Sequence, residues 1–226
     1  MRSFFFFFPL WLQATVCYFT PPSGWSCADP KQLSPNVQVG FIGNSPSGFR
    51  PSINLALEKV QISLKDYVKA VKKIHLAQPN TTWRDLGRFK LSAGEGRLTE
   101  ISTKSAWGDI KMLQALFIQD QTAYILTAAV SKKDYLQEQK ILLQSLQSLS
   151  LSPTLYTNLQ EDLKPLFETF FQSLKDGPDA SDPASWKKTK WSHLQSIVSQ
   201  AGDQMGSHWQ FLALKEGHAQ IYNSSR

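Results

Sequence analysis

Alternation of apolar and polar residues near the start of the chain predicts β-strands. Val37–Ile42 and Ile53–Val60 place apolar side chains at every second position, as a strand with one buried face does. Asn44–Pro51 lies between them and holds the Gly and Pro residues typical of a loop. A shorter strand is expected at Tyr18–Thr20, where Pro21-Pro22 would end it. We therefore expect three strands before the first helix.

The spacing of apolar residues changes to that of a helix after Ser63. Leu64, Val68 and Val71 fall on one stripe. The opposite side carries lysines that we interpret as a solvated face, namely Lys65, Lys69, Lys72 and Lys73. The pattern predicts a helix from Ser63 to about His75. Four strands are then expected at Trp83–Leu91, Gly96–Ser102, Ile110–Ile118 and Thr122–Val130.

The last of these strands is apolar along almost its whole length. Such a run in Thr122–Val130 is typical of a central strand that is covered on both faces. A second helix is expected at Lys132–Leu149. The predicted order of elements up to residue 151 is therefore three strands, a helix, four strands and a helix. The expected architecture is an α+β fold, an α/β/α sandwich with a central antiparallel sheet.

The pattern becomes mainly helical beyond residue 152, and we expect a helical C-terminal extension. One helix is predicted to begin at Pro165 and to end before a linker at Lys175–Ser181. Asp182-Pro183 should start another helix, which Gly202 should end. A final β-hairpin is expected, with Trp209–Leu214 and Ala219–Tyr222 as its two strands.

The first residues have the pattern of a secretory signal. One positive charge, Arg2, precedes an apolar run that contains Phe4–Phe8. The expected organisation is a signal peptide or anchor at 1–17, a folded unit at 18–151 and an extension at 152–226. The protein is therefore expected to be exported, as a periplasmic, membrane-associated or secreted protein. Cys17 is a candidate for lipidation, or for a disulfide with Cys27, and two unpaired thiols are the simplest alternative.

Charge is uneven along the chain. The whole sequence of 226 residues has a net charge of +6, but residues 1–150 hold 17 Lys and Arg against 10 Asp and Glu. Residues 151–226 hold 7 against 8. A candidate basic binding surface lies on two adjacent predicted strands and consists of Arg84, Arg88, Lys90 and Arg97. Its expected partner is another protein or an anionic membrane surface; nucleic acid is disfavoured because export argues against it.

Standard catalytic and metal-binding motifs are missing from the sequence. It contains no His-Glu-x-x-His, no Cys-x-x-Cys and no Gly-x-Ser-x-Gly. We therefore expect no catalytic residues, no bound metal and no cofactor. Two weaker alternatives stay open: a hydrolase that pairs Cys27 with His193 or His208, and a metal held by His208 and His218 across the predicted final hairpin.

Five features follow one another along the chain: the Tyr18–Trp25 opening, Asn54–Leu57 with the helix after it, Trp107-Gly108, Gln121–Ala129 and the helix end Leu142–Leu149. In these features residues 18–151 resemble the Mog1/PsbP-like superfamily, especially its exported PsbP and DcrB-like branch. The resemblance implies an α/β/α sandwich around an antiparallel sheet. Members of this superfamily share a fold more than a function, and no binding residue can be transferred from them to a position of this chain.

These observations predict a non-enzymatic, exported binding or accessory protein of the bacterial envelope. The alternative is a secreted interaction or effector protein whose extension, residues 152–226, binds a partner. A Cys/His hydrolase is the third interpretation.

Overall fold

The computed structural model describes residues 15–45, 48–106, 108–175, 177 and 182–223. Within these ranges the main element is a seven-stranded sheet of order β2-β3-β4-β8-β7-β6-β5, in which every pair is antiparallel. The predicted fold class, an α+β fold with a central antiparallel sheet, is confirmed. The strands are β2 (Ser26–Cys27), β3 (Val37–Ile42), β4 (Ser52–Lys59), β5 (Thr81–Leu91), β6 (Gly94–Ser105), β7 (Gly108–Gln119) and β8 (Thr122–Ser131).

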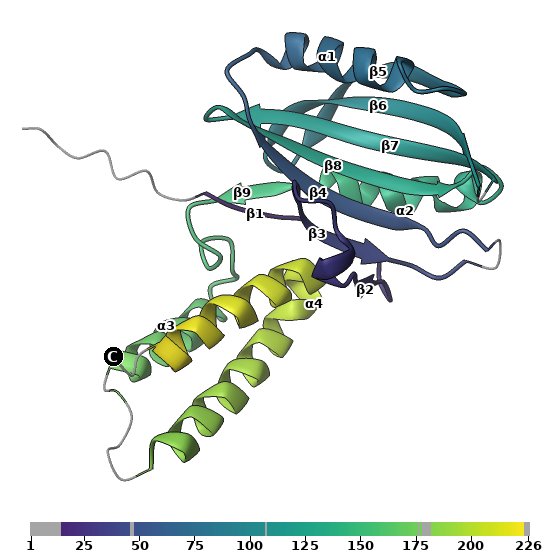
Figure 1. Ribbon diagram of the computed structural model, residues 1–226. Helices are drawn as coiled ribbons and strands as arrows, with labels where there is room; N and C mark the ends of the chain where they lie inside the picture. The colour runs from purple at the N-terminus through teal and green to yellow at the C-terminus, as the bar shows by residue number, and fades with distance from the viewer. Residues whose placement is uncertain (1–14, 46–47, 107, 176, 178–181, 224–226) are drawn as a thin grey trace, which may run out of the picture.

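One helix covers each face of this sheet (Figure 1). Helix α1 (Leu64–Leu76) packs Val68 and Val71 against Ile125 of β8. Helix α2 (Tyr135–Gln147) packs on the other face, in the core that contains Leu126. Adjacent residues of β8 are therefore buried on opposite faces, as the continuous apolar run predicts.

Strand β5 changes the face to which its side chains point. The register between β5 and β6 shifts between Asp85 and Gly87, which marks a β-bulge. Before the bulge, Trp83 packs into the α1 core; beyond it, Phe89 and Leu91 join the α2 core. Residues of one strand that would share a face in a regular pleat are thus divided between the two faces.

The segment just before the sheet unit pairs with the segment just after it. Strand β1 (Val16–Tyr18) lies antiparallel to β9 (Ser150–Ser152), with Cys17 opposite Leu151. The predicted first strand therefore begins two residues earlier than expected, and β9 was not predicted. Both strands are only three residues long, too short for a periodic signal, so only the long-range pairing reveals them.

The extension is helical and has its own hydrophobic core. Helix α3 (Lys164–Lys175) and helix α4 (Pro183–Asn223) bury Phe167, Phe170 and Trp209 among other apolar side chains. The predicted helix start is confirmed, because Asp182 Oδ1 accepts a hydrogen bond from the Ser185 N–H at 3.0 Å. Most of the predicted linker, including residues 178–181, lies outside the described residues.

Two predictions for the end of the chain are wrong. Gly202 lies inside α4, and the helix turns sharply at Gly206 instead, where φ is 82° and ψ is 164°. The segment predicted as a hairpin is the second arm of α4 (Figure 1). Burial there recurs at every fourth residue, which is the period of a helix. These buried residues are Trp209, Ala213, Gly217 and Ile221.

Candidate functional site

A groove lies between the first half of α1 and the hairpin formed by β5 and β6. Its volume is about 480 Å³. We call it the basic groove. Its walls contain Leu64, Lys65, Val68 and Lys69 of α1 and Asp85, Arg88, Glu95, Gly96 and Arg97 of the hairpin.

Local structure places the charged residues of α1 on the groove. Ser63 begins the helix, because its side chain accepts a hydrogen bond from the Asp66 N–H at 3.2 Å. Lys65 and Lys69 are four residues apart and therefore lie on the same side of the helix. They adjoin the apolar residues Leu64 and Val68, so the groove combines an apolar wall with a cationic edge.

The hairpin supplies two arginines from adjacent strands. Arg88 of β5 lies directly opposite Arg97 of β6. Arg97 forms an ion pair with Asp85, and Arg88 lies 3.6 Å from Glu95. Burial alone would raise the pKa of Asp85, but hydrogen bonds from Arg97 and from the Gly87 N–H outweigh it and lower that pKa.

The groove keeps an excess of positive charge after these pairings. Four basic side chains line it against two carboxylates, Asp85 and Glu95. Lys69 is paired with Asp66 at 2.9 Å, at the helix surface. Lys65 has no ion-pair partner within 4.0 Å in the part of the chain that the structure describes. Anions are therefore the ligands that the groove attracts.

The structure brings only part of the predicted basic surface together. Arg88 and Arg97 line the groove, whereas Arg84 lies before the bulge and pairs with Glu100 at 3.1 Å, toward α2. Lys90 is exposed and lies opposite Glu95 without lining the groove. Sequence analysis missed the contribution of Lys65 and Lys69. Their i, i+4 spacing was the available signal, but a solvated helix face has the same pattern.

The two cysteines are free thiols. Burial raises the pKa of the Cys17 thiol to about 12, and its side chain packs against the α2 core. Cys27 is exposed, and its thiol donates a weak hydrogen bond to the Ala28 carbonyl at 3.7 Å. Partial burial of the Cys27 sulfur, within a residue that is exposed as a whole, also raises the pKa of this thiol. A nucleophilic cysteine needs the opposite shift, so neither environment favours the hydrolase alternative.

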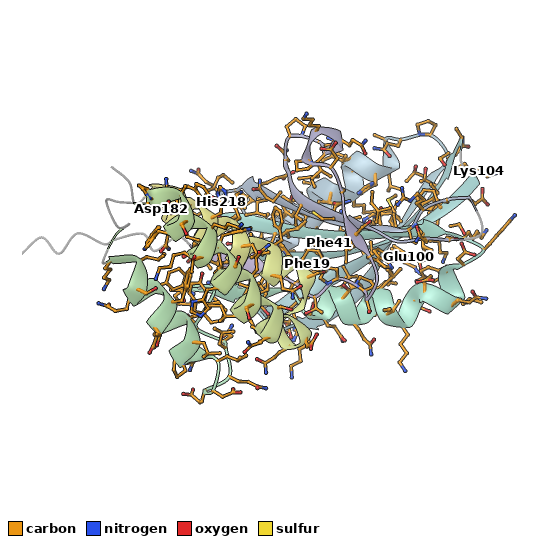
Figure 2. The ribbon with its side chains drawn as sticks, turned by 90° about the horizontal axis from the view of Figure 1, so that it is seen from below. Phe19, Phe41, Glu100, Lys104, Asp182 and His218 are labelled. Atoms are coloured by element: carbon orange, nitrogen blue, oxygen red, sulfur yellow. The ribbon has the colours of Figure 1, made fainter. Side chains whose placement is uncertain are left out.

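The weaker alternative of a metal held across a final hairpin is wrong, because His208 and His218 lie ten positions apart on one helical arm. His208 is buried beside Phe19 and Phe41, whereas His218 stacks on Tyr222 with ring centroids 4.2 Å apart. Figure 2 shows His218 well apart from Phe19 and Phe41. No group of three or more His, Cys, Asp or Glu residues suited to a metal occurs among the described residues.

Among the residues that the structure describes, no helix combines the length and the apolar character that crossing a bilayer requires.

Comparison with known proteins gives similarity at the level of structure. No family model matches the chain, and no curated protein matches it. One similar solved structure is LpqN of Mycobacterium tuberculosis, described as involved in cell envelope biogenesis. It is 11% identical over 62% of this chain and 85% of its own, with a TM-score of 0.48.

Two further solved structures carry the names of the resembled superfamily. Cyanobacterial PsbP from Synechocystis is 11% identical over 64% of this chain and 96% of its own, with a TM-score of 0.45. The Ran-binding protein Mog1p of Saccharomyces cerevisiae is 16% identical over 60% and 93%, with a TM-score of 0.42. The structures that this chain is similar to thus include Mog1/PsbP-like folds, and the likeness concerns the fold alone.

Proposed function

We propose that this chain is an exported, non-enzymatic binding protein of the bacterial envelope that holds an acidic segment of a partner protein in the basic groove. The observation that carries the proposal is the groove itself. Its volume of about 480 Å³ falls within the range of roughly 300–1,000 Å³ typical of ligand sites. Export is supported by the charge and apolar run at the N-terminus, and the envelope is the compartment that the resembled exported branch suggests.

Complementarity of charge and polarity favours an acidic peptide segment. Lys65 and Arg88 can attract carboxylates, while Leu64 and Val68 can pack against the aliphatic parts of the segment. Arg88 is 79% exposed, so its contribution should weaken as salt screens the charges. The extension is a less suitable site, since it uses most of its large apolar side chains inside its own core.

The chemistry of the titratable groups supports a binding role over catalysis. Both thiols have raised pKa values, and the Nδ1 atom of His208 is occupied by a hydrogen bond from the backbone of Phe19. None of these groups lines the basic groove. The proposed binding role uses only the charged and apolar side chains that line the groove, and it requires none of these reactive groups.

Fluorescence anisotropy with a labelled hexaglutamate peptide tests the proposal. We expect salt-sensitive binding to the native chain and at least a tenfold loss of affinity in the double variant Lys65→Gln with Arg88→Gln. The matched control is Lys133→Gln with Lys140→Gln, which removes two exposed charges on the α2 side. The control should bind the peptide like the native chain.

The same variants distinguish the membrane alternative. In sedimentation with vesicles rich in anionic phospholipid, the native chain and the double variant at Lys65 and Arg88 should bind to the same extent. Vesicle binding that is lost in the groove variant, together with no binding of hexaglutamate, would replace the acidic protein by a membrane surface. Equal peptide binding by groove and control variants would reject the groove as the site.

A further inference from the structure

A second, smaller cavity lies along the opposite flank of α1. It has a volume of about 200 Å³ and is bounded by α1 and by strands β4, β7 and β8. Its apolar walls include Val71, Ile74 and Ile125. It shares no residue with the basic groove. The basic groove has mainly cationic side chains, whereas the polar groups of this cavity are mainly hydrogen-bond acceptors.

Gln114 presents an acceptor that the protein leaves unpaired. The side chain is only 8% exposed, and its Nε2 atom donates a hydrogen bond to Thr127 Oγ1 at 3.1 Å. Its Oε1 atom is buried and has no hydrogen-bond partner, although Gln114 lines the cavity. An unpaired buried polar atom is costly to leave without a partner, so it indicates that something else completes the site.

His75 at the end of α1 provides a second unpaired atom. It also lines the cavity, and its Nδ1 atom is buried without a hydrogen-bond partner. Burial lowers the pKa of His75, which favours the neutral ring. A neutral imidazole has one nitrogen that can accept a hydrogen bond. Two acceptors on different elements thus border one small space.

Glu58 adds a negative charge at the same cavity. Its Oε2 atom accepts a hydrogen bond from the Tyr67 hydroxyl at 2.6 Å. Within the described ranges no Lys, Arg or His nitrogen lies within 4.0 Å of the Glu58 carboxylate. The neighbouring Lys59 is directed elsewhere, since its Nζ atom donates to Thr122 Oγ1 at 2.9 Å. The carboxylate therefore has a hydrogen bond but no counter-ion.

We propose that this cavity binds a primary alkylammonium group, with the ammonium directed to Glu58, Gln114 and His75 and the alkyl chain on the apolar wall. An ammonium has three donors and a positive charge, which matches two neutral acceptors and one carboxylate. The cavity of about 200 Å³ equals roughly six or seven water volumes of about 30 Å³ each. That space suits a short amine or a lysine side chain.

Titration with butylammonium, followed by amide and side-chain NMR shifts of the full chain, tests this site. Shifts should appear at the Gln114 side chain, and the uncharged 1-butanol should bind at least tenfold more weakly. Glu58→Gln keeps an acceptor for Tyr67 but removes the charge, so it should lower butylammonium affinity at least tenfold. The control Glu138→Gln changes a carboxylate on α2 and should leave the affinity unchanged.

A second variant keeps the proposal falsifiable if the charge change alters the helix. Gln114→Met preserves the length of the side chain and removes the acceptor, so it too should weaken butylammonium binding. Equal affinity for butylammonium and 1-butanol, or unchanged affinity in both variants, would show that the cavity holds water only and would overturn the proposal. Hexaglutamate binding is measured at the other groove, so the two proposals fail separately.

Two probes distinguish the sources of such an ammonium. Binding of butylammonium but not of an Nα-acetylated lysine amide would indicate a free small amine as the ligand. Binding of the lysine amide, and of a lysine-containing peptide, would indicate a side chain of a partner protein. Either result supports an alkylammonium site, whereas binding of neither probe contradicts it.

Discussion

The backbone N–H of Phe19 donates a hydrogen bond to Nδ1 of His208, 3.3 Å away, across 189 positions of the sequence. The two rings also pack, with centroids 4.9 Å apart, and Phe41 of β3 completes the cluster. Figure 2 labels Phe19 and Phe41, which lie next to each other. His208 is only 2% exposed, and burial lowers its pKa to about 4. The bond requires an unprotonated Nδ1. This hydrogen bond between the sheet unit and the extension therefore needs a neutral histidine.

Acid should weaken the protein through His208. The unfolded histidine binds a proton near pH 6.5, whereas the folded one does so only near pH 4. The unfolded state therefore holds more protons between these values, and the free energy of unfolding should fall as pH decreases through this window. The loss should reach up to about 3 kcal/mol by pH 4. Urea unfolding measured between pH 7 and pH 4 gives this slope.

His208→Asn provides the corresponding variant. Asparagine can still accept the Phe19 hydrogen bond through its side-chain oxygen, but it does not titrate. The variant should lose the stability slope between pH 6.5 and 4, while His193→Asn, on the exposed side of the same helix, should retain it. A slope that persists in His208→Asn would mean that another group is responsible.

Gly206 should tolerate a side chain poorly, because both its backbone conformation and its neighbours oppose one. Its φ of 82° and ψ of 164° lie in a region that is almost restricted to glycine. A Cβ there would also approach Thr20 Cγ2 to 2.9 Å. We expect Gly206→Ala to lower the free energy of unfolding by about 2–3 kcal/mol. Gly24→Ala, at a φ of 78° with no neighbour within 4 Å, should destabilise the protein clearly less. Equal decreases of the melting temperature in the two variants would contradict a clash at Gly206.

Glu100 should contribute to stability through three neighbours. Its carboxylate accepts hydrogen bonds from Arg84, Lys111 and Tyr135, each at 3.1 Å. Burial alone would raise the pKa of Glu100, but the Lys111 and Tyr135 hydrogen bonds and attraction to Lys111 and Arg84 outweigh it and lower the pKa. We expect Glu100→Gln to lower the free energy of unfolding by about 2 kcal/mol at neutral pH.

The pH dependence of this effect has a definite sign. A carboxyl with a lowered folded pKa stabilises the protein above its unfolded pKa, near 4.3, and loses that contribution as pH falls below it. The difference between native chain and Glu100→Gln should therefore shrink in acid. Glu161→Gln changes a carboxylate that is 90% exposed and should shift stability by less than about 0.5 kcal/mol. Similar losses in the two variants would refute the role of Glu100.

The N-terminal boundary can be tested through β1. A chain that begins at Tyr18, as the predicted 1–17 boundary implies, lacks the pairing of Val16 and Cys17 with β9. A chain that begins at Thr15 retains it. We expect the shorter chain to be less stable by about 1–2 kcal/mol in thermal unfolding. Given the proposed export, mass spectrometry of the mature chain should correspondingly give an N-terminus before Val16, and one at Tyr18 would contradict this expectation.

Much of the sheet unit could be predicted because its elements are long and periodic. Val37–Ile42 is observed with the predicted bounds, and Thr122–Ser131 is buried on both faces as its apolar run indicates. Helix α1 begins after Ser63 as predicted. In these segments local propensity, binary pattern and tertiary burial agree, so the sequence pattern is a sufficient guide.

The candidate sites were less predictable because they depend on geometry between elements. The bulge after Asp85 sends Arg84 to one face and Arg88 to the other, although their spacing alone suggests one patch. Lys65 becomes part of a groove only because α1 lies beside the β5–β6 hairpin. The unpaired oxygen of Gln114 can be recognised only when all its neighbours are known.

The sequence by itself determined the α+β class, the order of the principal strands and the helical character of the extension, because these follow from local periodicity. Tertiary structure decided the pairing of β1 with β9 and the placement of the basic residues of β5 on two faces of the sheet. It also decided that the chain ends in a helical arm and not in a hairpin. Gly202 and Gly206 look alike as local helix-ending signals. Only packing distinguishes them, since Gly202 is buried inside the helix and Gly206 makes the turn that places His208 against Phe19.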